Sequence, residues 1–98
     1  MNIQAMMKQA QKLQKEMMEE KEKIDKMKFE NTNSFVTVKA NGKKEIIEVK
    51  INQDNLNKDD IEMLQDIIVV AINNCFKQID DETEKKMGKY TQGMPGSF

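Results

Sequence analysis

The stretch Ile67-Ile68-Val69-Val70-Ala71-Ile72 is the only run of six consecutive apolar residues in this 98-residue chain. Such a run has no solvated face, and by itself it fits a buried strand or a buried segment of a helix. Its flanks favour a helix, because apolar residues continue at spacings of three and four on both sides without an intervening Gly or Pro. The flanking positions are Ile61, Leu64, Cys75 and Ile79.

The polar residues around this stretch indicate where the helix begins and ends. Asn57 is suited to an N-cap, and Asp59 and Asp60 follow in the first turn, where acids interact well with the positive end of the helix dipole. Lys85 and Lys86 lie near the other end, where cations are favourable. We therefore expect a helix over residues 58–86.

The middle third of this expected helix is apolar all round, so one face of a sheet cannot cover it. A second copy of the chain is the simplest cover, and the sequence therefore predicts a homodimer. The expected dimer interface contains Ile67, Ile68, Val69, Val70 and Ile72.

The composition agrees with burial between subunits, since 38% of the residues are hydrophobic and 34% are charged. Sixteen basic and seventeen acidic side chains leave a net charge of −1, so nucleic-acid binding would need a local basic patch. The chain start does not resemble a signal peptide, and no stretch approaches the roughly 20 apolar residues of a membrane span. We expect one domain, residues 1–98, in the cytoplasm and without a membrane partner.

Residues 3–27 carry a heptad pattern, with seam residues separated alternately by three and four. The pattern predicts a helix over residues 1–26 with a narrow apolar seam that Glu20 interrupts. A helix of about 25 residues is roughly 37 Å long, which exceeds the width of so small a domain, so part of it should project. The seam residues are Ile3, Met6, Ala10, Leu13, Met17, Glu20, Ile24 and Met27.

Between the two expected helices the apolar spacing changes to two, which predicts three antiparallel strands, at about 27–31, 35–40 and 44–51. A two-residue turn at Asn41-Gly42 would pair Val38 with Glu45. A similar turn at Thr32-Asn33 would pair Phe29 with Val36. We thus expect a sheet over residues 27–51 whose apolar face receives the helix at 58–86.

The predicted fold class is α+β, with an α-β-β-β-α subunit in which a long N-terminal helix and a C-terminal helix flank the three-stranded antiparallel meander. Residues 87–98 contain three of the four glycines and the only proline, and we expect them to form a mobile tail.

The side-chain inventory argues against catalysis. Histidine is absent, and the single cysteine, Cys75, falls on an apolar helix stripe, where a buried core residue is expected. No cluster of Cys or His suits a metal, and no Gly-rich loop suits a phosphate. The carboxylates fall in runs typical of solvated helix faces. We expect neither an enzyme nor a bound metal or cofactor.

Basic residues are unevenly spread along the first expected helix. Residues 1–15 contain three lysines and no acid, and the lysine spacings of four and three place them on one stripe, which could contact DNA phosphates or simply be solvated. A second basic cluster follows near residue 86. The candidate DNA-binding residues are Lys8, Lys12, Lys15, Gln4, Gln11, Lys85, Lys86 and Lys89.

The chain resembles the YbaB/EbfC family of nucleoid-associated proteins over nearly its whole length. The matching segments are Met7-Lys8-Gln9-Ala10-Gln11-Lys12-Leu13-Gln14, Val36-Thr37-Val38-Lys39-Ala40-Asn41-Gly42, Ile47-Glu48-Val49-Lys50-Ile51, Asp60-Ile61-Glu62-Met63-Leu64-Gln65-Asp66-Ile67-Ile68, Lys86-Met87 and Gly93-Met94-Pro95-Gly96. The resemblance implies a tweezer-like homodimer whose first helices extend as arms. It also implies a cytoplasmic protein that binds DNA, organises the nucleoid and influences transcription.

We therefore expect a non-enzymatic protein that binds double-stranded DNA as a homodimer through phosphate contacts. Base readout should be minor, because the sequence contains no Arg, the main bidentate reader of guanine. The alternative is a protein-interaction scaffold whose first helix recruits a helical partner, such as a recombination or replication factor.

Overall fold

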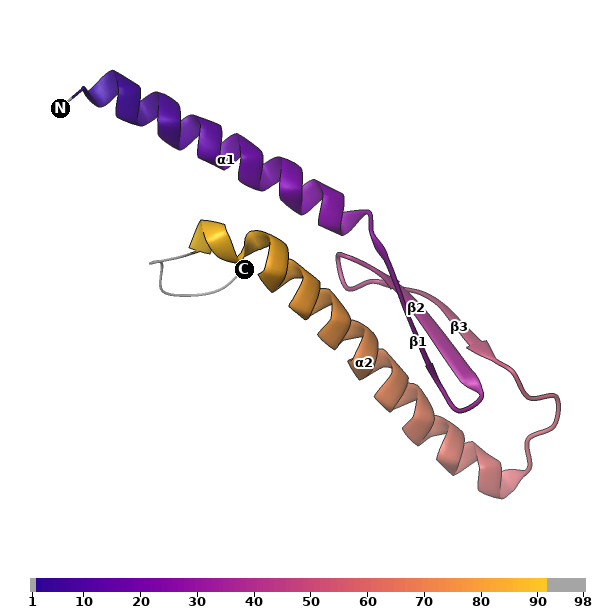
Figure 1. The fold of residues 1–98 in the computed structure, drawn as a ribbon. Helices are drawn as coiled ribbons and strands as arrows, with labels where there is room; N and C mark the ends of the chain where they lie inside the picture. Colours follow the sequence, from indigo (N-terminus) through magenta and orange to yellow (C-terminus); the bar gives the residue numbers. More distant parts are fainter. Residues whose placement is uncertain (1, 92–98) are drawn as a thin grey trace.

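The computed structural model of the chain describes residues 2–91 and confirms the predicted α+β order (Figure 1). Helix α1 (Ile3–Asp25) is followed by strands β1 (Lys28–Asn33), β2 (Val36–Asn41) and β3 (Ile46–Ile51) and by helix α2 (Lys58–Thr91). The strands form one antiparallel sheet in the order β1-β2-β3.

Helix α1 leaves the body of the protein as a long projection (Figure 1). It begins where the Asn2 Oδ1 atom accepts hydrogen bonds from the backbone N–H groups of Gln4 (3.0 Å) and Ala5 (3.3 Å). Every side chain from residue 3 to residue 16 is exposed, whereas Ile24 near the other end is buried. The molecule measures 71 × 23 × 14 Å, and we refer to residues 3–16 as the arm.

The strand pairing predicted for the first hairpin is wrong. Phe29 pairs with Ala40 and Asn33 with Val36, so the turn lies at residues 34–35, two residues later than expected. Ser34 adopts a φ of 54°, which allows the tight turn there. The pattern of β-forming residues does not reveal the position of the turn, because that position depends on one residue adopting a left-handed backbone conformation.

The predicted pairing of the second hairpin is also wrong. Val38 pairs with Val49, and the loop between β2 and β3 contains four residues, 42–45, instead of two. Asn41 remains in β2, and its Oδ1 atom accepts hydrogen bonds from the backbone N–H groups of Lys43 (2.9 Å) and Glu45 (3.1 Å). Lys44 takes the left-handed position, with a φ of 62°. A bulge after Lys39 absorbs the resulting shift in register.

Helix α2 begins with reciprocal hydrogen bonds between Asn57 and Asp60: each side chain accepts from the other residue's backbone N–H, at 3.0 and 3.1 Å. The helix continues to Thr91, so the predicted end at residue 86 and the tail beginning at residue 87 are wrong for residues 87–91. Burial of Met87 explains the extension, since it outweighs the low helix propensity of Gly88. Residues 92–98 of the expected tail lie outside the described residues.

The core forms between α2 and the first two strands. Ala71, Cys75 and Ile79 are buried at successive turns of α2 and pack against the sheet. Their partners on the sheet are Phe29, Val36, Val38 and Ala40. The predicted burial of Cys75 is confirmed, and its thiol donates a hydrogen bond to the Val38 carbonyl oxygen at 3.3 Å.

The third strand departs from the expectation that α2 would cover the whole apolar face of the sheet. Helix α2 contacts β1 and β2, and every residue of β3 is exposed. Val49 and Ile51 point to the same face as the buried Val38 and Val36, with which they pair. The sheet is therefore wider than the one helix that packs on it, and an apolar strip along β3 stays uncovered.

Burial of Cys75 predicts a pH dependence of stability. Desolvation raises the pKa of the Cys75 thiol above its ordinary value of 9.0, a hydrogen bond from the Asn31 backbone opposes the rise, and the Glu30 charge adds to it. As pH rises through 9, the Cys75 thiol ionises more readily in the unfolded chain than in the folded chain, so the free energy of unfolding should fall as pH rises.

The measurement is urea unfolding of the wild type and of Cys75→Ala at pH 8 and pH 10. We expect the wild type to lose more stability between these pH values, by up to about 1.4 kcal/mol per pH unit above the unfolded pKa. Equal losses in the two proteins would contradict the burial of an un-ionised thiol.

Candidate nucleic-acid interface

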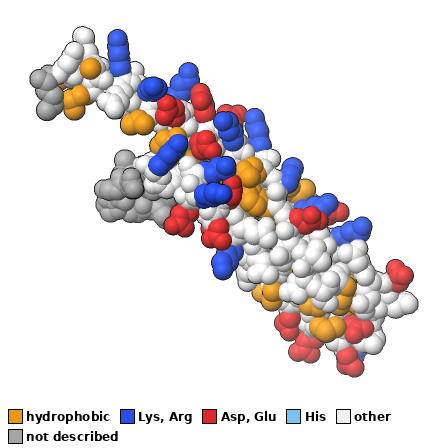
Figure 2. Space-filling model, viewed as in Figure 1, with side chains coloured by type: hydrophobic (Ala, Val, Ile, Leu, Met, Phe, Trp, Pro, Cys, Tyr) orange, Lys and Arg blue, Asp and Glu red, His pale blue; other side chains and the backbone are white. Residues whose placement is uncertain are grey.

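Three lysines form a basic stripe on the arm. Lys8, Lys12 and Lys15 are all exposed, and in the α1 helix their spacing places them along one face. Gln4 and Gln11, the other two residues predicted for the site on this helix, are exposed on the same arm. Figure 2 shows lysines on one edge of the arm and apolar side chains on the opposite edge. We refer to Lys8, Lys12 and Lys15 as the arm lysines.

The arm lysines are available for an external anion. Within residues 2–91, the ion pairs of the structure involve none of the three. No acidic residue precedes Glu16 in the sequence, so the first turns of α1 carry positive charge only, up to Glu16, one turn beyond Lys12. A phosphate approaching this face would meet no fixed carboxylate before the second half of α1.

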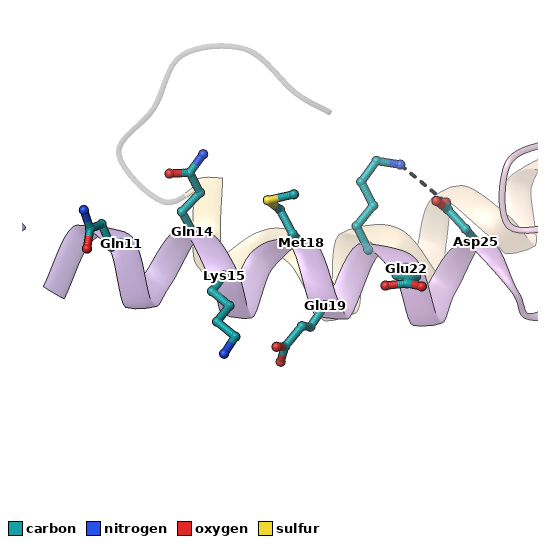
Figure 3. A pocket seen from close by; sticks show the side chains of 8 residues that line it. Gln11, Gln14, Lys15, Met18, Glu19, Glu22 and Asp25 are labelled. Atoms are coloured by element: carbon teal, nitrogen blue, oxygen red, sulfur yellow. Dashed lines mark hydrogen bonds and ion pairs between the residues drawn. The ribbon is translucent and has the colours of Figure 1, made fainter. Parts of the chain in front are cut away.

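The second half of α1 is acidic, and some of its charges are neutralised within the helix. Lys21 lies 3.4 Å from Asp25, and Lys26 lies 3.2 Å from Glu22, each measured between nitrogen and carboxylate oxygen. In Figure 3, Lys15 and Glu19 extend from the same side of α1, one turn apart. The basic stripe therefore ends near residue 15, and the net charge of α1 is positive only in its first half.

A shallow hollow runs along α1 from Gln11 to Asp25, and Figure 3 shows the side chains that line it. All of its lining residues belong to this one helix. A surface formed by a single helix cannot enclose a small substrate, but it can lie against an extended macromolecule. In the described part of the chain, no group of three or more His, Cys, Asp or Glu residues is placed to hold a metal ion.

The second predicted cluster lies at the end of α2, where the last turns of that helix run alongside α1 (Figure 1). Its three lysines differ in their surroundings. Lys86 forms an ion pair with Glu82 at 3.5 Å, and the Lys89 ammonium lies 5.0 Å from the centre of the Tyr90 ring. Lys85 is exposed. Because part of its charge is engaged, this cluster is a weaker candidate for phosphate contact than the arm lysines.

The residues predicted for a dimer interface fall into two groups. Val69 and Val70 have 57% and 43% of their surface exposed, whereas Ile67, Ile68 and Ile72 are half-buried against the core. Strand β3, which was not predicted to belong to the interface, exposes 49%, 42% and 40% of the surface of Ile47, Val49 and Ile51. Their alternation along the chain was visible, but only the position of α2 on the sheet reveals that they are uncovered.

The described residues contain no helix that is both long and apolar enough to cross a membrane.

Comparison with known proteins adds independent information. The chain matches the model of the YbaB/EbfC DNA-binding family over residues 1–94. It is 50% identical over 101 residues to a nucleoid-associated protein of Oceanobacillus iheyensis, which covers 99% of this chain and 97% of the relative. A nucleoid-associated protein of Clostridium novyi is 46% identical over 102 residues, and the match covers 100% of this chain and 90% of the relative. A nucleoid-associated protein of Enterococcus faecalis is 42% identical over 97 residues, and the match covers 97% of this chain and 93% of the relative.

Proposed function

Because the chain belongs to the YbaB/EbfC DNA-binding family, we propose that it binds double-stranded DNA as a homodimer, mainly through contacts to phosphates. Its place would be the nucleoid in the cytoplasm, where it organises DNA and influences gene expression. The residues that we propose for DNA contact are Lys8, Lys12, Lys15, Gln4 and Gln11, with Lys85, Lys86 and Lys89 as a secondary set.

The observation that carries this proposal is the basic stripe of the arm. Lys8, Lys12 and Lys15 are exposed, share a face and lie on a projecting helix without acidic neighbours before Glu16. Ammonium groups at this spacing can contact successive phosphates without reading bases. A local patch is needed, because the net charge of −1 gives the whole chain no attraction for DNA.

A homodimer would double this charge and cover the apolar strip on β3. Two surfaces are uncovered in one subunit: the inner face of β3, with Val49 and Ile51, and the side of α2 that carries Val69 and Val70. A twofold axis could place the α2 helix of each subunit against the β3 strand of the other. Val69 and Val70 of one subunit would then contact the apolar strip on β3 of its partner, and the reverse. Such an interface is mainly apolar, as in obligate dimers.

The proposal is tested by the fluorescence anisotropy of a labelled duplex of about 30 base pairs, titrated with the wild-type protein at roughly 50 and 200 mM salt. We expect binding that weakens steeply with salt and differs little between duplex sequences. Absence of binding at the lower salt concentration would contradict a DNA-binding function for this chain.

A second candidate function, recruitment of a helical protein partner, is favoured by the apolar edge of the arm. Ile3, Met6 and Leu13 on the heptad seam are 71%, 54% and 50% exposed. An amphipathic helix could lie on this seam. Cross-linking in cell extract separates the two functions, since nucleic acid should dominate the captured material under the first and one protein under the second.

A further inference from the structure

The loop between β2 and β3, residues 42–45, touches the last turn of α1, at the base of the arm. At Gly42 a Cβ atom would overlap the carbonyl group of Ile24 and would lie 3.0 Å from the Asp25 Cα atom. The loop backbone therefore lies directly against the last turn of α1, and only a hydrogen atom fits between them. This contact is made by backbone atoms, so it cannot be relieved by a side-chain rotation.

The same loop is attached to α2 on its other side. The Lys44 ammonium lies 2.6 Å from the Asp80 carboxylate and 5.8 Å from the centre of the Phe76 ring. The loop also holds its own shape, since the Asn41 Nδ2 group donates to the Glu45 carboxylate at 2.9 Å in addition to the two bonds that Asn41 Oδ1 accepts. The loop thus connects the end of α1 to the middle of α2.

The direction of the arm depends on the few contacts at its base, because no side chain of residues 3–16 is buried. Met17 is half-buried and Ile24 is buried, and these two positions lie roughly 10 Å apart along the helix. With Met17 as the pivot, a displacement of about 1 Å at Ile24 would move the outer end of α1, roughly 20 Å beyond Met17, by about 2 Å. The arm amplifies any shift of the loop.

We propose that this loop, through Gly42 and Lys44, is a positioning element that sets the direction of α1 and thereby the placement of the arm lysines. The inference rests on the proposed function for its role in DNA binding, because a duplex can engage both arms of a dimer only if their separation matches its phosphate spacing. Gly42 and Lys44 act through α1 and need not touch DNA.

The test is Gly42→Ala, with Gly88→Ala as the matched control, because a Cβ atom at Gly88 would have no neighbour within 4 Å. Spin labels on Gln9→Cys and Lys77→Cys, in a Cys75→Ala background diluted with unlabelled chains, report the distance from α1 to α2 by electron–electron resonance. Residue 9 lies roughly 12 Å beyond Met17, so we expect a shift of about 1 Å or a clear broadening for Gly42→Ala, and the wild-type distance for Gly88→Ala.

A second variant, Asp80→Asn, removes the ion pair to Lys44 at nearly constant volume and serves if Gly42→Ala does not fold. We expect it to broaden the distance distribution without moving its centre as far. The proposal would be overturned if Gly42→Ala and Asp80→Asn, where they fold, both gave the wild-type distance distribution.

DNA titrations of the same proteins separate the two inferences. If the arm moves in Gly42→Ala, its affinity for the duplex should fall several-fold while that of Gly88→Ala is retained. A wild type that does not bind DNA would remove the proposed function, whereas the distances would still decide whether the loop directs the arm.

Discussion

Reversing the charge of the arm lysines, in Lys8→Glu/Lys12→Glu/Lys15→Glu, is expected to reduce the affinity for a duplex by roughly a thousandfold at about 50 mM salt. Two arms in a dimer present six lysines, and losing six phosphate contacts would reduce the magnitude of the negative slope of log K against log salt by about 5. The fold should persist, because all three side chains are exposed and none has an ion pair in the described part of the chain.

The matched control changes the same number of charges elsewhere. Lys50, Lys58 and Lys77 are exposed and lie outside α1, so Lys50→Glu/Lys58→Glu/Lys77→Glu gives the protein the same net charge as the arm variant. We expect it to retain most of the affinity. Equal losses in the two triple variants would show that binding follows net charge and not the arm, and would contradict the proposed site.

Replacement of Val49 by Asp is expected to dissociate the dimer. The side chain is 42% exposed in one subunit, so the subunit can tolerate a carboxylate there, whereas the proposed interface would bury it without a partner. An unpaired buried charge costs at least about 2–5 kcal/mol, and a twofold interface incurs this cost twice. The dimer dissociation constant should rise by at least about a thousandfold.

Sedimentation equilibrium checks this prediction, because the mass should fall from twice the chain mass of 11.4 kDa to that mass. Lys50→Asp is the control, since its side chain extends from the opposite face of β3. A dimer that survives Val49→Asp, or a wild type that is already monomeric at micromolar concentration, would rule out the β3 interface.

The order of the elements could be predicted from the sequence because each carries its own periodicity. The heptad spacing of residues 3–27, the alternation in the three strands and the apolar run at residues 67–72 each specify one element without reference to the others. The arm lysines were predictable for the same reason, since spacings of four and three within one helix suffice to place them on one face.

The hairpin registers were not predictable from these patterns. Both turns depend on a single residue with positive φ, Ser34 in one and Lys44 in the other, and neither residue type marks such a position in a sequence. Asn41 illustrates the difficulty. It was expected within the turn, but its side chain closes the loop from the end of the strand.

The position where a helix ends, and which faces of the sheet are buried, depend on tertiary packing. The low helix propensity of Gly88 predicts that the helix ends there, yet α2 continues to Thr91 because Met87 is buried. The apolar face of β3 follows from alternation, but its exposure follows from the position of α2 over β1 and β2. The sequence therefore predicted an apolar dimer surface on α2, and it gave no reason to include β3.

The proposed binding of DNA by two chains together is tested most directly by sedimentation velocity of the wild type with an excess of a duplex of about 30 base pairs, at roughly 50 mM salt. We predict a complex that contains two chains for each bound duplex and dissociates as salt is raised. Protein and duplex that sediment separately, or a complex with one chain per duplex, would contradict it.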